Sequence, residues 1–165
     1  MKILREGLIK LIQRQKWNIY WSEYASDTYL YGSKVLFHKK DDVEFSNELM
    51  PPGTIIKQWY SKTNFQMQKI EPTLPIIDGE RRYRITINID TNGKGCCLVR
   101  LLFFDRFDNE AGNITIRDKV TEFSCPLKTY SYRLQLINGG VTDIHFHSVV
   151  IQEIIDETEK EIKTT

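Results

Sequence analysis

The sequence predicts an all-β fold, and three observations carry that prediction. Apolar and polar residues alternate with a period of two over much of the chain, as in strands that bury one face. Turn-forming residues separate these segments at intervals of roughly ten residues, a spacing typical of a sandwich or barrel. The chain also holds 8 Tyr, 8 Phe and 3 Trp among 165 residues, and aromatic rings pack well on a pleated sheet. Together these observations favour a jelly-roll-type antiparallel β-sandwich over an open sheet.

Before the strands, residues 2–16 have the spacing of a short basic amphipathic helix. Leu4, Leu8, Leu11 and Ile12 lie at helical intervals among basic residues. So short a helix needs a surface to dock on, so we expect it to pack across one end of the sandwich or to pair with a partner. The alternative is peripheral contact with an anionic membrane surface. The segment lacks the apolar run of a signal peptide, and we expect a cytoplasmic protein.

A single β-sandwich domain is expected over residues 17–154, followed by a charged tail, 155–165, that should fray. Its strands are expected at residues 17–21, 29–37, 43–49, 54–61, 65–70, 82–90, 97–105, 113–124, 130–137 and 143–154. Turn signals between them are Pro51-Pro52-Gly53, Asp78-Gly79, Asn92-Gly93-Lys94-Gly95, Asp108-Asn109 with Gly112, and Asn138-Gly139-Gly140.

Two of these segments carry the fold prediction furthest. Residues 97–104 are apolar almost throughout, as in a central strand covered on both sides, and Arg100 within it needs a partner. Residues 130–153 predict a hairpin, because Asn138-Gly139-Gly140 tolerates the positive φ of a reversal. In the last strand we expect one face to hold Ile144, Phe146, Ser148 and Val150, and the other His145, His147, Val149 and Ile151.

The net charge and the cysteines argue against nucleic-acid binding, a disulfide framework and a zinc site. The net charge of +1 supplies no overall field to recruit nucleic acid. Cys96, Cys97 and Cys125 are odd in number, two of them adjacent, which suits neither a disulfide framework nor zinc spacing. We expect reduced thiols, with Cys97 and Cys125 filling the core.

Catalytic and metal sites find little support. His145 and His147 project to the same side of a strand, but a metal needs further ligands and the chain has only one other histidine, His38. No nucleophile elbow or phosphate loop is present in the sequence. We therefore expect ordinary strand histidines, no catalytic residue, no metal and no cofactor. A small hydrolase or metal-dependent enzyme would rest on these two histidines alone.

Aromatic clustering is the better lead to a site. Trp17, Tyr20, Trp21, Tyr24, Tyr29 and Tyr31 fall close together, and Trp59-Tyr60 follows later. We expect most of these rings to fill the core, while exposed ones would offer a flat apolar platform to a partner or substrate. Tyr29, Tyr31, Trp59 and Tyr60 are the predicted contact residues. Asp105 and Arg106 are expected to form an ion pair at a strand end.

Seven segments, taken in order, resemble a known family over roughly residues 17–154. They are SDTYLYGS (26–33), FSNELMPPGT (45–54), WYS (59–61), LP (74–75), FFDRFD (103–108), YSYRLQLINGG (130–140) and FHSVVIQE (146–153). The chain resembles the third accessory secretory protein of the accessory Sec system of Gram-positive bacteria. The resemblance implies a fold like that of a carbohydrate-binding module, which agrees with the jelly-roll prediction.

The resemblance also implies a function. It predicts a cytosolic, non-catalytic subunit that binds two other accessory secretory proteins and acts with the accessory Sec motor ATPase. The cargo would be a serine-rich-repeat glycoprotein adhesin, engaged during export. The alternative is a free-standing carbohydrate-binding module without a transport partner. An unpaired edge strand would suit an extended serine-rich segment, because it can pair with one more strand.

Overall fold

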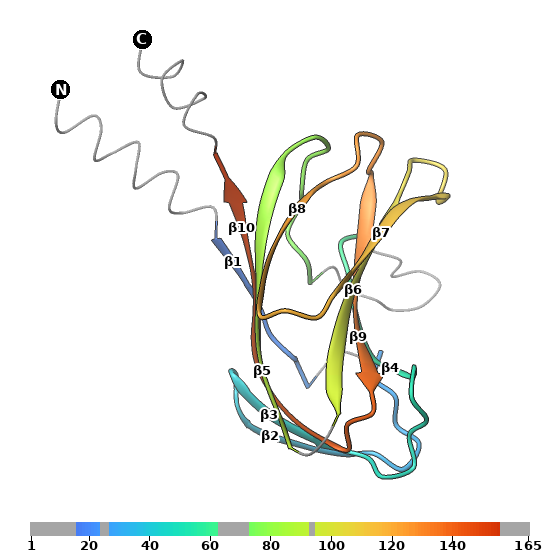
Figure 1. Ribbon diagram of the computed structural model, residues 1–165, viewed down its shortest axis with the longest axis vertical. Coiled ribbons are helices and arrows are strands. Elements are labelled where there is room, and N and C mark those ends of the chain that lie inside the picture. Colours follow the sequence, from blue (N-terminus) through green and yellow to red (C-terminus); the bar gives the residue numbers. More distant parts are fainter. Residues whose placement is uncertain (1–15, 24–26, 63–72, 93–94, 156–165) are drawn as a thin grey trace, which may run out of the picture.

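The computed structural model describes residues 16–23, 27–62, 73–92 and 95–155, and these form two antiparallel sheets packed face to face (Figure 1). This confirms the predicted sandwich. The strands are β1 (Lys16–Ile19), β2 (Lys34–Lys39), β3 (Asp42–Ser46), β4 (Ile55–Tyr60), β5 (Arg82–Asn92), β6 (Cys96–Phe104), β7 (Glu110–Ile116), β8 (Val120–Ser124), β9 (Ser131–Gly139) and β10 (Asp143–Ile154). The predicted helix 2–16, except for its last residue, and the predicted strand 65–70 lie outside the described residues, as do Tyr24 and nearly all of the tail.

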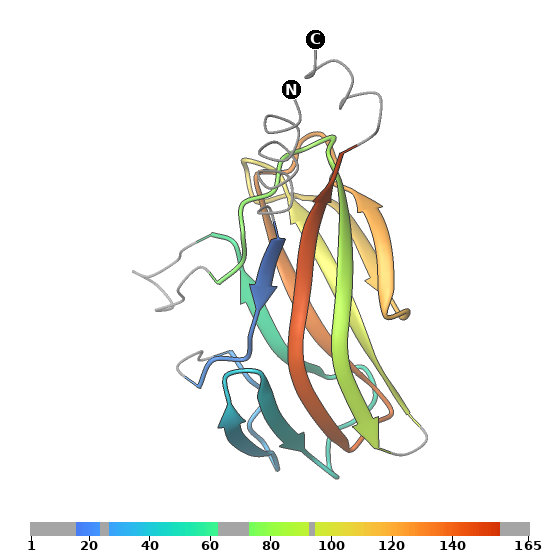
Figure 2. The ribbon, with the colours of Figure 1, turned by 90° about the vertical axis from the view of Figure 1, so that its left-hand side faces the viewer.

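The six-stranded sheet has the order β2-β3-β10-β5-β8, and β1 also pairs with β10. The long strand β10 changes partner along one edge: its first half pairs with β3 and its second half with β1 (Figure 2). The four-stranded sheet has the order β4-β9-β6-β7. Strand β6 is therefore a central strand, as predicted for residues 97–104, but only one of its faces is covered. Leu98, Arg100, Leu102 and Phe104 stay partly exposed on the other face.

The core lies between the sheets and contains two groups of aromatic rings. Trp59 stacks on Phe146 with centroids 5.3 Å apart, and Trp21 meets both Trp59 and Phe45 at 6.4 and 5.6 Å. The second group joins the sheets through Phe103, whose ring is 6.1 Å from Phe123 and 6.4 Å from Tyr132, while Phe123 lies 5.7 Å from Tyr83. Such rings bury large apolar areas.

The predicted hairpin 130–153 is wrong. β9 pairs with β4 and β6, whereas β10 pairs with β1, β3 and β5, so residues 140–142 cross from one sheet to the other. Asn138, 2% exposed, supports this crossing: its carboxamide oxygen accepts bonds from the Gly140 and Val141 amides, and its NH₂ group donates to the carbonyls of Met50 and Pro51. Gly140 has a φ of 104°, which a glycine adopts without strain.

Three strand predictions also differ in detail. The expected strand 113–124 is two strands, because Arg117–Lys119 carry the chain from β7 in one sheet to β8 in the other. The expected strand 29–37 begins only at Lys34, since Tyr31 and Gly32 form a turn in which Gly32 has a φ of 74°. In β10 a register shift between Phe146 and Ser148 changes the inward face, which becomes Ile144, Phe146, Val149 and Ile151.

Candidate functional site: the outward face of the four-stranded sheet

The outward faces of the two sheets differ in chemistry. On the six-stranded sheet, Glu122 pairs with Arg82 and Arg84 at 3.1 and 2.9 Å, and Arg81 pairs with Glu153 at 2.6 Å. Ion pairs of this kind are typical of a surface that faces water. This face therefore gives no indication of a binding site.

The outward face of the four-stranded sheet is more apolar. Its residues alternate with core residues along β4, β9 and β6, so their side chains leave the sheet on the side away from the core. We call this set the outer face: Ile55, Gln58, Tyr60, Leu98, Arg100, Leu102, Phe104, Arg133, Gln135 and Ile137. Of the ten, only Arg133 is largely exposed, whereas Gln135 and Ile137 are buried at 4% and 7% exposure.

Strand register arranges most of the outer face in rows that run across the strands. At one end, Ile55 pairs with Ile137, and Ile137 pairs with Leu98 on the next strand. Three aliphatic side chains side by side make a smooth apolar row. Ile137 is 7% exposed, so Ile55 and Leu98 supply most of the apolar surface that this row offers to a partner.

The next row is a chain of amide and guanidinium groups. The Arg100 Nε donates to the Gln135 Oε1 at 2.9 Å, and the Gln135 Nε2 donates to the Gln58 Oε1 at 2.8 Å. Gln135 is thus the hydrogen-bond partner that we expected Arg100 to need within an apolar strand. Because these groups bond one another, they can lie in a largely apolar surface at little cost.

In the third row, register places Tyr60, Arg133 and Leu102 side by side, and Phe104 lies diagonally beside Arg133. The Arg133 guanidinium lies 5.3 Å from the Tyr60 ring centre and 4.9 Å from that of Phe104. The Tyr60 hydroxyl donates to the Asp27 carboxylate, and burial together with this carboxylate raises the pKa of Tyr60. Farther along, Tyr130 is 60% exposed and lies beneath both Lys62 and Arg106. Arginine and aromatic side chains are the types most enriched where proteins bind one another.

Beside this row, the free edge of β4 is closed by residues 27–29. The Tyr29 amide donates to the Ile56 carbonyl at 2.8 Å, and the Gln58 amide donates to the Asp27 carbonyl at 3.2 Å. Lys57 lies under this segment with 0% of its surface exposed, and its Nζ is 5.7 Å from the Trp59 ring centre. Burial lowers the pKa of Lys57 to about 8, although Asp27 opposes the shift.

The four predicted contact residues lie in different places. Tyr60 belongs to the outer face, and Tyr29 is half-buried in the segment that closes the β4 edge. Tyr31 is 74% exposed in the turn before β2. Trp59 is 1% exposed, its ring fills the core, and its Nε1 donates to the Tyr20 carbonyl at 3.0 Å. A joint contact role for these residues stays a prediction, although Trp59 presents no ring at the surface.

Sequence reasoning missed Arg133, Gln135 and Phe104 as site residues. Arg133 and Gln135 alternate with apolar residues over 130–137, a pattern that indicates only the polar side of a strand. What makes them part of a site is their register with Tyr60 and Gln58 on another strand, which no local pattern encodes. The predicted ion pair of Asp105 with Arg106 also differs: Asp105 accepts from the amides of Phe107 and Asn109, while Arg106 covers Tyr130.

The histidines lie on the outward face of the other sheet, each beside a carboxylate. His145 is 3.6 Å from Asp42, His38 is 3.0 Å from Glu44, and the His147 Nε2 is 3.0 Å from Asp90. The His147 Nδ1 also bonds the Asp41 carbonyl at 2.9 Å, and these contacts raise the pKa of His147. Within the described ranges, no three His, Cys, Asp or Glu residues are grouped as a metal would require. Nothing in this geometry turns the histidines into a catalytic set.

Comparison with known protein families and sequences identifies the family to which the chain belongs. The model of the family "Accessory Sec secretory system ASP3" matches residues 28–153 of the chain. The chain belongs to this family. The family's accessory Sec system protein from Streptococcus gordonii is 35% identical over 156 residues, which cover 89% of this chain and 98% of that protein. The family suggested by the seven sequence segments is therefore confirmed.

Solved structures agree with the family assignment. One chain in the crystal structure of accessory secretory proteins 1, 2 and 3 of Streptococcus pneumoniae superposes with a TM-score of 0.78 at 29% identity, covering 84% of this chain and 96% of that one. A chain of the Gap123 complex of Streptococcus agalactiae gives 0.77 at 31% identity, covering 86% of this chain and 45% of that one. No helix in the part of the chain that the structure describes has the length and apolarity needed to cross a membrane.

Proposed function

We propose that this chain is a non-catalytic subunit of the accessory Sec export machinery and binds two other accessory secretory proteins. The observation that carries the proposal is the family assignment, together with the likeness to chains in structures of accessory secretory protein complexes. The same proposal places the chain in the cytoplasm. There it would act with the accessory Sec motor ATPase and contact the serine-rich-repeat glycoprotein. Peripheral membrane contact through residues 2–16 remains part of it as well.

The outer face of the four-stranded sheet is the proposed partner surface. It combines an apolar row, Ile55–Ile137–Leu98, with a cluster in which the Arg133 guanidinium lies over the rings of Tyr60 and Phe104. The opposite sheet carries ion pairs instead, so the two faces of the sandwich offer a partner very different surfaces. Burial of an apolar centre with arginine and tyrosine anchors supplies most of the affinity in protein interfaces.

Co-expression tests this proposal. The chain, carrying an affinity tag, is produced together with the two other accessory secretory proteins, and the amounts that co-purify are measured. We expect a stable complex whose affinity falls about thirtyfold or more on Tyr60→Ala combined with Arg133→Ala, since anchors of this type contribute about 2 kcal/mol or more. Arg84→Ala is the matched control, because it removes an outward strand arginine from the other sheet. Recovery of the chain only as a free monomer would contradict the proposal.

The alternative, a free-standing carbohydrate-binding module, makes a different prediction. Sugars stack on open ring faces, but on the outer face the guanidinium of Arg133 already lies over both Tyr60 and Phe104. Calorimetric titration of the chain alone with glycans separates the two functions. Binding that is lost when Tyr31 or Tyr130, both exposed, is changed to Ala would favour the module.

A further inference from the structure

Strand β5 is longer than its neighbour on one side. β10 pairs with it along its whole length, from Arg82 to Asn92, but β8 pairs only with residues Arg82 to Thr86. One more bond joins the Ile87 amide to the Lys119 carbonyl at 2.8 Å. Beyond that point, the described residues provide no strand on the β8 side of β5.

The direction of the unpaired backbone groups follows from this last bond. In a strand, the N–H and C=O groups of one residue point to the same side, and those of the next residue point to the other. Since the Ile87 amide points toward β8, the amides and carbonyls of Ile89 and Thr91 point there too, away from β10. The structure describes no protein partner for these four groups on that side.

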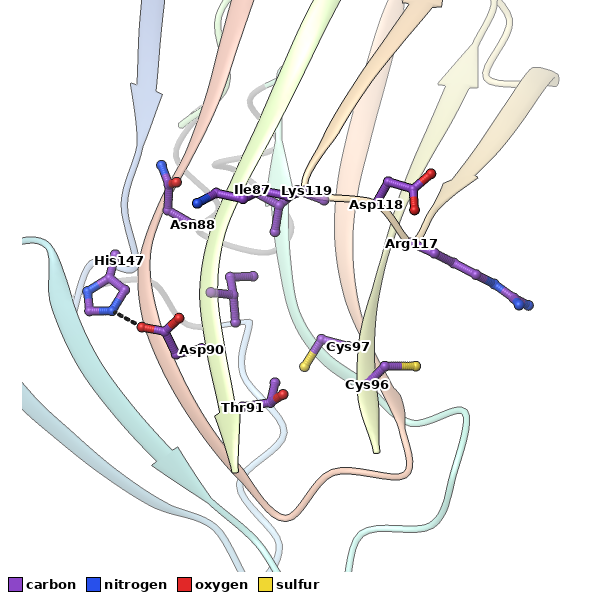
Figure 3. A pocket seen from close by; sticks show the side chains of 11 residues that line it. Ile87, Asn88, Asp90, Thr91, Cys96, Cys97, Arg117, Asp118, Lys119 and His147 are labelled. Atoms are coloured by element: carbon purple, nitrogen blue, oxygen red, sulfur yellow. Dashed lines mark hydrogen bonds and ion pairs between the residues drawn. The ribbon is translucent and has the colours of Figure 1, made fainter. Parts of the chain in front are cut away.

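A cavity of about 360 Å³ lies along this edge (Figure 3). Figure 3 shows β5 on one side and the start of β6, with Cys96 and Cys97, on the other, while the turn Arg117–Lys119 crosses above. Both faces of β5 line the cavity. Ile87 and Ile89 belong to the core side, and Asn88, Asp90 and His147 belong to the outward side.

Three other edges, those of β4, β2 and β7, are less suited to pairing. The β4 edge is closed by residues 27–29, as described above. β2 carries exposed Lys34, His38 and Lys39, and lysines on an edge strand discourage further pairing. β7 contains Gly112 and faces a register shift at Phe103–Phe104, which interrupts a regular ladder.

We propose that the edge of β5 from Asn88 to Asn92 takes up an extended, unfolded polypeptide segment of another protein by strand addition. The backbone groups of Ile89 and Thr91 would bind the segment, which would continue the line of β8 for about five residues. Side chains of the segment would alternate between two environments. Inward ones would meet Ile89 and Cys97, which suits small apolar residues, and outward ones would meet Asn88 and Asp90, which suits serine or threonine.

This inference rests on the proposed function in one respect: a serine-rich export cargo is a polypeptide of this chemistry. The site itself is tested on the isolated chain. A chain that forms its complex but takes up no peptide would overturn the site and leave the proposed function standing.

The probe is a synthetic ten-residue peptide in which serine alternates with valine, flanked by lysines for solubility. Amide hydrogen exchange of the chain is followed residue by residue by NMR, with and without the peptide. In the free chain, the Ile89 and Thr91 amides should exchange much faster than those of Asn88 and Asp90, which point to β10. With saturating peptide, the Ile89 and Thr91 amides should slow by about tenfold or more.

A pair of variants makes the test specific to the backbone. Thr91→Pro removes one of the donors on the open edge without removing a bond to β10, whereas Thr91→Ala keeps the donor and changes only the side chain. Strand addition predicts that Thr91→Pro abolishes the protection and Thr91→Ala retains it. No protection in the wild type, equal binding by Thr91→Pro, or protection located on β2 or β7 would overturn the proposal. Protection that appears without peptide as protein concentration rises would assign the edge to a second copy and overturn it also.

Discussion

Lys57 offers a quantitative test of how the β4 edge is built. Its side chain is buried among Trp21 and Trp59 beneath residues 27–29, and its ammonium lies 6.0 and 5.7 Å from the two ring centres. Burial lowers the pKa of Lys57 from 10.5 to about 8. The folded state therefore holds this proton less tightly than the unfolded chain does. A pKa difference of this size corresponds to about 3 kcal/mol of destabilisation at pH 7.

The sign of the pH dependence follows from the two pKa values. Between pH 8 and 10.5 the unfolded chain binds more protons at Lys57 than the folded chain, so this residue makes stability rise with pH. From pH 7 to pH 9 the gain works out at about 1.4 kcal/mol. Lys57→Met removes the titrating group and keeps an unbranched side chain in the same space. We expect this variant to be more stable at pH 7 by about 1 to 3 kcal/mol, and this advantage to shrink by about 1.4 kcal/mol at pH 9.

Urea unfolding at several pH values measures this difference. When the free energy of unfolding of the variant is subtracted from that of the wild type at each pH, the contribution of the cysteines cancels. One of these cysteines is Cys97, whose pKa is raised to about 12 by burial. Lys39→Met, which replaces an exposed lysine of β2 in the same way, is the matched control. If Lys57→Met is less stable than the wild type at pH 7 and their difference does not vary with pH, the reasoning from burial is refuted.

Three further predictions concern the crossing at residues 140–142, the turn before β2 and the contact of His147 with Asp90. Asn138→Ala should lower the free energy of unfolding by about 3 kcal/mol, because it leaves the Gly140 and Val141 amides without their acceptor. Calorimetry should show a fall of about 6–12 °C in Tm, and an unchanged Tm would contradict the assigned bonds. Asn47→Ala should cost about 2 kcal/mol and speed proteolysis at residues 30–32, since Asn47 bonds the Tyr31 carbonyl, the Ser33 hydroxyl and the Leu49 amide; equal cleavage rates would count against this role. Asp90→Asn should lower the pKa of His147 measured by NMR, because the Asp90 carboxylate helps to raise it, and an unchanged titration of His147 would exclude the pair. The stabilisation that the raised pKa provides is present below about pH 6.5 and is lost as pH rises through the folded pKa.

Local patterns predicted those parts of the fold that depend on one strand at a time. The alternation of Tyr83 and Ile85 against Arg82 and Arg84 correctly gives the inward and outward faces of β5. The same reasoning failed at β10, because its pairing with β5 contains a register shift beside His147 that no local pattern encodes. A turn of Asn138-Gly139-Gly140 fits a hairpin and an inter-sheet crossing equally well, since both need a reversal with positive φ.

The candidate site shows the same limit. Trp59 and Tyr60 are adjacent and must point to opposite sides of β4, but the sequence alone does not decide which of them faces the core. The structure places Trp59 inward against Phe146 and Tyr60 outward beneath Arg133. Rows such as Gln58–Gln135–Arg100 join residues up to 77 positions apart, and only the strand register brings them together.

Amide hydrogen exchange with mass spectrometry, on the chain alone and in its complex with the two other accessory secretory proteins, tests the central claim most directly. We predict that protection gained in the complex falls on peptides from β4, β9 and β6, whose outward side chains form the proposed partner surface. Protection confined to β2, β3 and β8, with β4, β9 and β6 unchanged, would contradict the account.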